Sequence, residues 1–149
     1  MAIPGFPRRR FLIGAAACCL AGCEPAADSA AQDDIRDLLV GTWLREYEDG
    51  GVRVRRVLAL DAAGHFRESS RIVQPGANEI ESEHAGDWLY DGTNLKRHYT
   101  MMDGRPPSAP TIPFATFELQ FPTRNEFTGI DRVRRLEVTY RRVDDGTRP

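Results

Sequence analysis

The stretch Gly86-Asp87-Trp88-Leu89-Tyr90-Asp91-Gly92-Thr93-Asn94-Leu95 carries the pattern that decides the fold of this chain. Its central Asp-Gly pair separates two runs that are rich in apolar and aromatic residues. An Asp-Gly pair between strand-like runs is a strong signal of a tight β-hairpin. A hairpin joins its two strands antiparallel, so strands that follow one another in the chain become neighbours in the sheet.

The same pattern of a short run followed by a turn extends over residues 42–143. Turn-forming residues rich in Gly, Asp, Asn and Pro occupy 49–51, 61–64, 74–78, 91–92, 103–104, 122–125 and 129–131. They leave eight candidate strands, at about 42–48, 52–60, 65–73, 79–90, 93–102, 112–121, 125–130 and 132–143. The one longer connection is the proline-rich loop 103–113.

Apolar and polar side chains alternate along several of these strands, which predicts one apolar face per strand. Eight such strands without covering helices favour a sheet that closes on itself, because closure buries the apolar face and removes exposed edges. We therefore predict an all-β protein, an eight-stranded antiparallel up-and-down meander that closes as a barrel. The expected inward set is bulky and predicts a filled or narrow interior: Phe66, Tyr99, Met101, Phe114, Phe117, Phe127 and Leu136.

A short helix is predicted just before the first strand. Asp33 is a candidate N-cap, and Ile35, Leu38 and Leu39 follow at helical spacing. Gly41 ends the pattern. A helix of one or two turns at this place can close one end of the barrel.

Several short motifs resemble those of lipocalin-like domains. Leu39-Val40-Gly41-Thr42-Trp43 resembles the G-x-W signature at the start of a lipocalin barrel. Residues 58–66 and 86–95 resemble hairpins of small bacterial lipocalin-like domains, and Tyr140-Arg141-Arg142 lies where lipocalins carry a late arginine. The resemblance covers about residues 39–143. It implies a lipocalin-like barrel in which Arg141 or Arg142 stacks on Trp43 as a structural closure, and it brings no activity, because these bacterial relatives largely lack an assigned function.

The N-terminus resembles the leader of a bacterial lipoprotein. Three arginines (8–10) precede the apolar run Phe11–Leu20, and Leu20-Ala21-Gly22-Cys23 resembles a lipobox. The resemblance implies cleavage between Gly22 and Cys23 and lipid attachment at Cys23. We therefore expect a signal peptide at 1–22, a flexible tether at 23–33 and a barrel domain at 34–146.

The leader also predicts a location in the bacterial cell envelope. Its apolar run of about ten residues is well short of the roughly 20 that span a bilayer as a permanent helix. Arg8-Arg9-Arg10-Phe11-Leu12 resembles a twin-arginine export motif, although a general secretory leader has the same features, and both routes stay open. Glu24, second in the mature chain, favours the outer membrane under the enterobacterial sorting rule. We expect a lipid-anchored protein on that membrane, facing the periplasm.

Charge and cysteine usage exclude several classes of function. The net charge of −2 becomes −5 without the three leader arginines, and an acidic module is a poor nucleic-acid binder. Cys18, Cys19 and Cys23 all lie in or next to the leader, so the barrel domain has no thiol for a disulfide or a zinc site. We expect no cofactor and no metal.

Arg56 and Arg97 are the candidate binding residues, because each lies among apolar residues of alternating strands. If they point inward, they could neutralise the anionic head group of a ligand, with Tyr99 and Phe117 lining the same site. The alternative for Arg56 is a β-bulge at residues 55–56 that turns its side chain to water.

No catalytic constellation is evident. His65, His84 and His98 lack metal-ligand spacing, and no glycine-rich phosphate loop or G-x-S-x-G elbow occurs. An enzyme is not expected. Two hypotheses remain: a barrel that binds a small apolar or amphipathic ligand, or a structural module that contacts an unidentified protein partner through its outer face or the loop 103–113.

Overall fold

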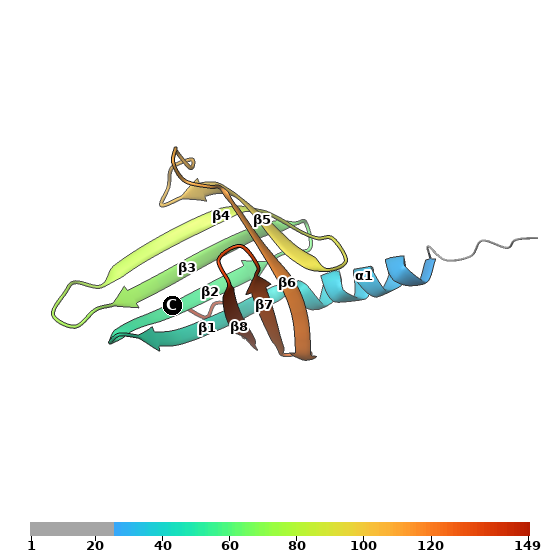
Figure 1. Cartoon of the computed structure of the whole chain (residues 1–149), viewed down its shortest axis with the longest axis horizontal. Helices are drawn as coiled ribbons and strands as arrows, with labels where there is room; N and C mark the ends of the chain where they lie inside the picture. The colour runs from blue at the N-terminus through green and yellow to red at the C-terminus, as the bar shows by residue number, and fades with distance from the viewer. Residues whose placement is uncertain (1–25) are drawn as a thin grey trace, which may run out of the picture.

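The chain folds into one closed antiparallel barrel preceded by a helix (Figure 1). The computed structural model describes residues 26–149. Its elements are α1 (Ala26–Leu39), β1 (Gly41–Asp49), β2 (Val52–Leu60), β3 (His65–Val73), β4 (Ile80–Tyr90), β5 (Asn94–Met102), β6 (Phe114–Thr123), β7 (Glu126–Asp131) and β8 (Leu136–Val143). The predicted fold class, an all-β eight-stranded up-and-down barrel with a short N-terminal helix, is confirmed.

Tight turns connect several of the strands, because the turn residues allow the backbone to reverse its direction within a few residues. Asp49 is paired directly with Val52, so Gly50 and Gly51 alone form the first turn. Both glycines have positive φ, 56° and 81°, the combination that a two-residue type I′ hairpin requires. In the β4–β5 turn the Asp91 carboxylate accepts hydrogen bonds from the backbone N–H groups of Thr93 and Asn94.

The last strand begins later than the sequence indicated, at Leu136 rather than 132. Asp131 accepts hydrogen bonds from the backbone N–H groups of Val133 and Arg134, at 3.0 and 2.9 Å. Arg135 has a positive φ of 54°. These local contacts form a turn at residues 132–135, although the composition of that segment is typical of a strand.

The helix begins earlier than predicted. The residues expected to form a flexible tether, 23–33, are helical from Ala26 onward, so that expectation is wrong for this part of the segment. Alanine has the highest helix propensity, and the segment is rich in it. Leu39 is fully buried at one end of the barrel, with Ile35 packed nearby, and Arg36 donates to the carbonyl of Ala62 at 2.9 Å. The N-terminal part of α1 projects beyond the barrel (Figure 1). Within residues 26–149 no helix is long and apolar enough to cross a membrane.

The end of the barrel next to α1, here called the base, is filled by aromatic side chains. The ring centroids of Trp43 and Phe127 lie 4.7 Å apart, and those of Phe127 and Tyr140 lie 5.0 Å apart. Leu58 and Leu60 complete this buried cluster. The opposite end, here called the mouth, carries the β1–β2, β3–β4, β5–β6 and β7–β8 connections. Strands β1 and β8 pair only over Thr42–Leu44, so they separate toward the mouth.

Three residues of the expected inward set are instead exposed, with 42% of Met101, 57% of Phe114 and 41% of Leu136 accessible. Thr100 is an extra residue in the β4–β5 ladder, because Gly86 pairs with Tyr99 and Ala85 with Met101. This bulge reverses the alternation beyond it and turns Met101 outward. Phe114 stacks on His98 at the start of β6, where it borders the mouth, and Leu136 lies at the exposed start of β8.

The C-terminal segment, residues 144–149, folds back over the outer face of β1 and β2. Thr42 Oγ1 donates to Asp145 Oδ1 at 2.6 Å, and Arg55 Nε donates to the carbonyl of Arg148 at 2.9 Å. Leu44 and Val57 form a cross-strand pair between these two contacts and are buried. The segment therefore covers an apolar patch that would otherwise face water.

Candidate functional site

A layer of charged side chains lies inside the barrel, between the aromatic base and the mouth. Glu68 on β3 and Arg97 on β5 are each 3% exposed, and Arg97 Nη1 lies 2.5 Å from Glu68 Oε2. Arg56 on β2 approaches the other oxygen, with Nη1 3.6 Å from Glu68 Oε1. His84 on β4 places Nδ1 3.7 Å from the same oxygen. Four adjacent strands thus each contribute one polar group to the interior.

The Glu68 carboxylate is held in its ionised form. Burial alone would raise the Glu68 pKa, but Arg97, His84 and Arg56 outweigh that effect and hold the pKa well below its usual range. Burial likewise opposes the charge on Arg97, and Glu68 raises the Arg97 pKa in return. The two side chains therefore form a buried ion pair that keeps both charges at neutral pH.

Arg56 points into the barrel rather than to water. The pairing of β2 with β1 and with β3 is regular across residues 55–56, so the alternative of a bulge there is wrong. The Arg56 side chain is 26% exposed, and its Nε atom is buried without a hydrogen-bond partner. Arg56 therefore has an electrostatic contact with Glu68 and unused hydrogen-bond donors.

Arg45 adds a third guanidinium to the inner face. It is the direct cross-strand partner of Arg56, and it lies between Trp43 and Tyr47 on the inward-facing side of β1. Its guanidinium carbon lies 4.3 Å from the centre of the Tyr47 ring. In the part of the chain that the structure describes, no carboxylate forms an ion pair with Arg45.

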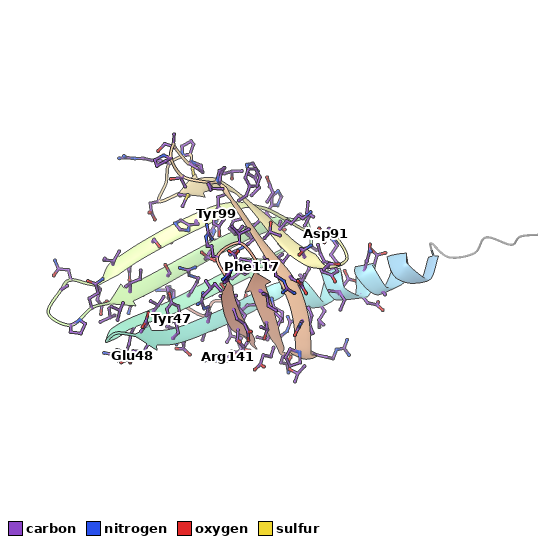
Figure 2. The ribbon with its side chains drawn as sticks, in the orientation of Figure 1. Tyr47, Glu48, Asp91, Tyr99, Phe117 and Arg141 are labelled. Atoms are coloured by element: carbon purple, nitrogen blue, oxygen red, sulfur yellow. The ribbon has the colours of Figure 1, made fainter. Side chains whose placement is uncertain are left out.

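Tyr99 and Phe117 lie beside Arg97, so the structure brings three of the four predicted ligand-binding residues into contact. Tyr99 and Phe117 are labelled in Figure 2. The Arg97 guanidinium carbon lies 5.4 Å from the Tyr99 ring centre and 5.6 Å from that of Phe117. It also lies 5.4 Å from the ring of Phe66. Burial raises the pKa of the Tyr99 phenol to about 12, so this group stays protonated. Arg97 is enclosed by aromatic faces and one carboxylate.

A cavity of about 410 Å³ opens at the mouth, above the charged layer. Arg56, Glu68, His84 and Tyr99 line its inner part. Its outer part is lined by residues of the loop 103–113 and its neighbours: Met102, Pro110, Thr111, Ile112, Phe114, Ala115 and Arg134. The cavity therefore combines charged groups at its inner end with an apolar rim, and its volume lies within the usual range of small-molecule sites.

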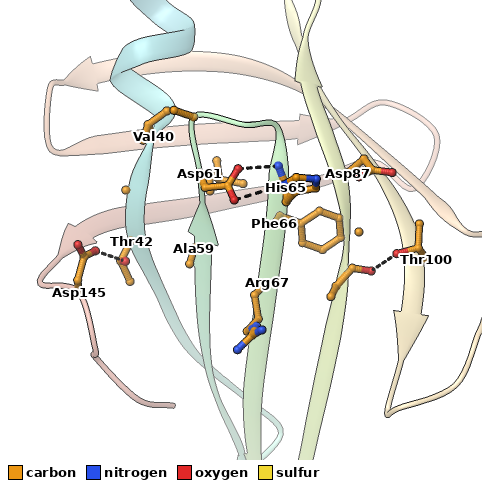
Figure 3. Close-up of a pocket in the computed structure, with 15 residues that line it drawn as sticks. Val40, Thr42, Ala59, Asp61, His65, Phe66, Arg67, Asp87, Thr100 and Asp145 are labelled. Carbon is orange, nitrogen blue, oxygen red and sulfur yellow. Dashed lines mark hydrogen bonds and ion pairs between the residues drawn. The ribbon is translucent and has the colours of Figure 1, made fainter.

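A second, larger hollow of about 740 Å³ lies along the outside of β2, β3 and β4 (Figure 3). It is lined mainly by outward-facing residues with small side chains, including Ala59 and Ala85, around the exposed Arg67. Two of its ionisable side chains pair with each other, since His65 Nδ1 lies 3.4 Å from Asp61 Oδ2. Because it lacks a buried charged group, it is a weaker candidate for a ligand site than the mouth cavity.

Arg142, and not Arg141, covers the tryptophan at the base. The Arg142 guanidinium carbon lies 4.2 Å from the centre of the Trp43 ring, and its Nη1 donates to the carbonyl of Val40 at 2.9 Å. Its Nη2 donates to the carbonyl of Leu38, at the C-terminal end of α1. Arg141 instead lies on the outside, where it pairs with Glu46 at 3.0 Å. Arg142 thus joins the helix, the first strand and the last strand.

The other titratable residues do not assemble into a site. His65, His84 and His98 lie near different carboxylates: Asp61, Glu68 and Asp87. Across the described residues no group of three or more His, Cys, Asp or Glu side chains could hold a metal ion. Gly22 and Cys23, the predicted cleavage and lipidation residues, lie outside the described residues.

Sequence reasoning missed Glu68 and His84 as members of the charged layer. Glu68 lies two residues after the buried Phe66, and this spacing places both on the same face of β3. The alternation of inward and outward side chains along this strand could therefore have placed Glu68 inside the barrel. The same signal was available for His84, which lies four residues before the buried Trp88 on β4 and therefore on the same face of that strand.

The fold and the interior together define a class: an up-and-down β-barrel of lipocalin-like architecture, with a filled base, a buried charged layer and a cavity at its mouth. A scan against protein-family models and a search of curated proteins each found no match to the chain.

Proposed function

We propose that this protein is a lipid-anchored lipoprotein of the bacterial cell envelope whose barrel binds a small apolar or amphipathic ligand. The mouth cavity of about 410 Å³ is the observation that supports binding, because it lies above a filled base and is lined by both apolar and charged side chains. An eight-stranded barrel either fills completely with side chains or holds one small ligand. This barrel is filled from the base to the buried Glu68–Arg97 pair, and the cavity lies beyond that pair.

The anchoring part of the proposal rests on the leader. Cys23 ends a lipobox-like stretch, and two residues separate it from the start of α1 at Ala26. A single acyl chain gives only marginal membrane binding, and two or more chains make an anchor stable. The barrel would then be held near the membrane surface, on the periplasmic side of the outer membrane.

Native mass spectrometry of the full chain from its own host tests the binding part of the proposal. The protein would be released from the membrane with a mild detergent and measured with and without activation that strips bound molecules. A reproducible added mass that disappears on unfolding supports a ligand. Repeated absence of such a mass, with no thermal stabilisation by fatty acids or lipids, contradicts the proposal.

A second function, contact with a protein partner, is favoured by one observation. Ile112 and Val133 are 71% and 94% exposed, on the β5–β6 and β7–β8 connections at the mouth. Exposed apolar groups of this kind often mark interaction sites. Val133→Ser should abolish capture of a partner in chemical cross-linking of whole cells, and it should leave a co-purifying ligand in place, because Val133 does not line the mouth cavity.

A further inference from the structure

The charged layer inside the barrel carries more positive than negative charge. Arg45, Arg56 and Arg97 all lie on inward-facing positions of their strands, and within residues 26–149 Glu68 is the one carboxylate that pairs with any of them. Asp131, near the mouth, is already paired with Arg134 at 3.4 Å. Three guanidinium groups therefore share one carboxylate, which leaves a net charge of +2 among these four side chains. Charge away from water requires pairing or hydrogen bonding to be stable.

The excess charge belongs to Arg56 and Arg45 rather than to Arg97. Arg97 is enclosed by Glu68 and three aromatic rings, and it does not line the mouth cavity. Arg56 lines that cavity and makes no side-chain hydrogen bond, since its nearest approach to Glu68 is 3.6 Å. A second buried donor without a partner, Arg97 Nε, lies in the same layer. The charged layer therefore has buried hydrogen-bond donors without acceptors.

The position of Arg45 strengthens this point. Arg45 and Arg56 are direct partners across β1 and β2, and both face inward. Like charges placed opposite each other on one face of a sheet repel and destabilise the pair. An anion between or beside the two guanidinium groups would convert this repulsion into attraction and would form short, charge-assisted hydrogen bonds.

We propose that the ligand of the mouth cavity is an amphipathic anion whose carboxylate or phosphate head group is bound by Arg56, with Arg45 contributing charge, and whose apolar part lies toward the rim formed by Met102, Ile112 and Phe114. This inference rests on the ligand-binding function proposed above and specifies the ligand's chemistry and orientation. Glu68 and Arg97 have a positioning role, because Arg97 holds the Glu68 carboxylate and Glu68 in turn attracts the Arg56 guanidinium.

A series of small probes tests the inference on the full chain. Hexanoate, hexyl phosphate and hexanol share one apolar chain and differ in head group, and inorganic phosphate supplies the anion without the chain. Apparent Kd values are measured by ligand-observed NMR at one fixed detergent concentration, and the partition of each probe into protein-free micelles is measured and subtracted. We expect hexanoate or hexyl phosphate to bind about 10- to 100-fold more tightly than hexanol, as hydrogen bonds to charged groups typically produce.

Variants of two arginines on one strand provide the matched comparison. Arg56→Gln should remove the preference for the anionic probes and leave hexanol binding unchanged, and Arg56→Lys should keep part of the preference. Arg53→Gln is the control, because Arg53 lies on the same strand, is exposed and faces outward. Thermal unfolding of each variant shows whether it is folded, and the comparison among probes on the unaltered chain does not depend on any variant.

Each outcome separates the two proposals. Equal affinity for hexanol and hexanoate overturns the anionic head group and leaves ligand binding standing. Binding of inorganic phosphate as tightly as hexyl phosphate supports anion recognition and overturns the amphipathic ligand. Failure of every probe to bind, with no co-purifying mass, overturns both.

Discussion

Glu68 is the residue on which the interior of this barrel depends. Its carboxylate contacts Arg97 and Arg56 and lies next to His84, although it is 3% exposed. An isolated buried carboxylate would be strongly destabilising, and paired groups inside a protein lose far more when one partner is removed than they gain by being present. The layer is therefore sensitive to the loss of its one acid.

We predict that Glu68→Gln lowers the free energy of unfolding at pH 7 by about 3–5 kcal/mol, the usual cost of breaking a buried ion pair. The Glu68 pKa is depressed in the folded protein, so its stabilising contribution is complete above about pH 4.3, the ordinary pKa of Glu. The contribution is lost as the pH falls below that value. Urea unfolding at pH 7 and pH 3 should show a smaller difference between the two proteins at pH 3.

Glu118→Gln is the control for this prediction. Glu118 pairs with the 70% exposed Arg132 at the surface, where an ion pair contributes about 0–1 kcal/mol. An equal loss of stability in both variants, or a difference for Glu68→Gln that persists unchanged at pH 3, would contradict the role given to Glu68.

Arg142 provides a second test at the level of single residues. We predict that Arg142→Ala lowers the free energy of unfolding by about 2–4 kcal/mol, because it removes two hydrogen bonds to the end of α1 and the contact with Trp43. Arg141→Ala, next in the chain, should cost less than about 1 kcal/mol, since Arg141 is exposed and pairs with Glu46 at the surface. Chemical denaturation of both variants measures the contrast, and similar losses would contradict it.

Among the secondary-structure elements, the β4–β5 hairpin is the most constrained. At its bulge the two backbones approach so closely that a Cβ added to Gly86 would lie 1.9 Å from the carbonyl oxygen of His98. We predict that Gly86→Ala destabilises the protein by about 3 kcal/mol or more, at the upper end of the cost of overpacking, because a backbone atom cannot rotate away as a side chain can. Thr100→Ala, at the exposed bulge residue, should have little effect on the thermal unfolding temperature.

The same hairpin shows what sequence can and cannot predict. The number of strands, their order and the bounds of β2 and β3 follow from local signals, namely Asp-Gly turns and period-two alternation. The outward turn of Met101 does not, because the bulge at Thr100 depends on pairing between two strands. The early start of α1 was missed because a polar, alanine-rich segment has composition typical of both a linker and a helix.

The sequence predicted single residues of the candidate site, but it did not predict which of them contact one another. Alternation placed Arg56 and Arg97 among inward-facing neighbours, and the structure puts both side chains in one charged layer. Glu68 lies on β3, the strand next to that of Arg56. Its position decides which arginine is paired and which one faces the cavity. The distances between side chains on different strands depend on how the sheet closes, and a local sequence pattern does not give them.

At the scale of the whole molecule, the barrel has two different ends. The base is filled with aromatic residues and joined to α1 through Arg142, and the mouth carries the cavity and the longer connections. The helix projects from the base, on the side away from the mouth (Figure 1). If Cys23 anchors the chain just before α1, the cavity is directed away from the anchoring end.

The anchor itself is open to a direct test. We predict that Cys23→Ala moves the protein out of the membrane fraction, because the acyl chains attached to that residue would be the one membrane contact. The measurement is fractionation of cells followed by immunoblotting, with Cys19→Ala as the matched control within the leader. Membrane association that persists in Cys23→Ala would show that another part of the chain attaches it.

The C-terminal segment has a practical consequence for anyone who produces this protein. Residues 144–149 cover Leu44 and Val57, and the last residues, Thr147 to Pro149, lie against β3 and β4. A purification tag fused to Pro149 would have to begin in that contact and could pull the segment off the barrel, exposing an apolar patch that promotes aggregation. The β3–β4 turn around Gly76 is exposed and has open space around it, so a tag inserted there would leave both ends of the domain undisturbed.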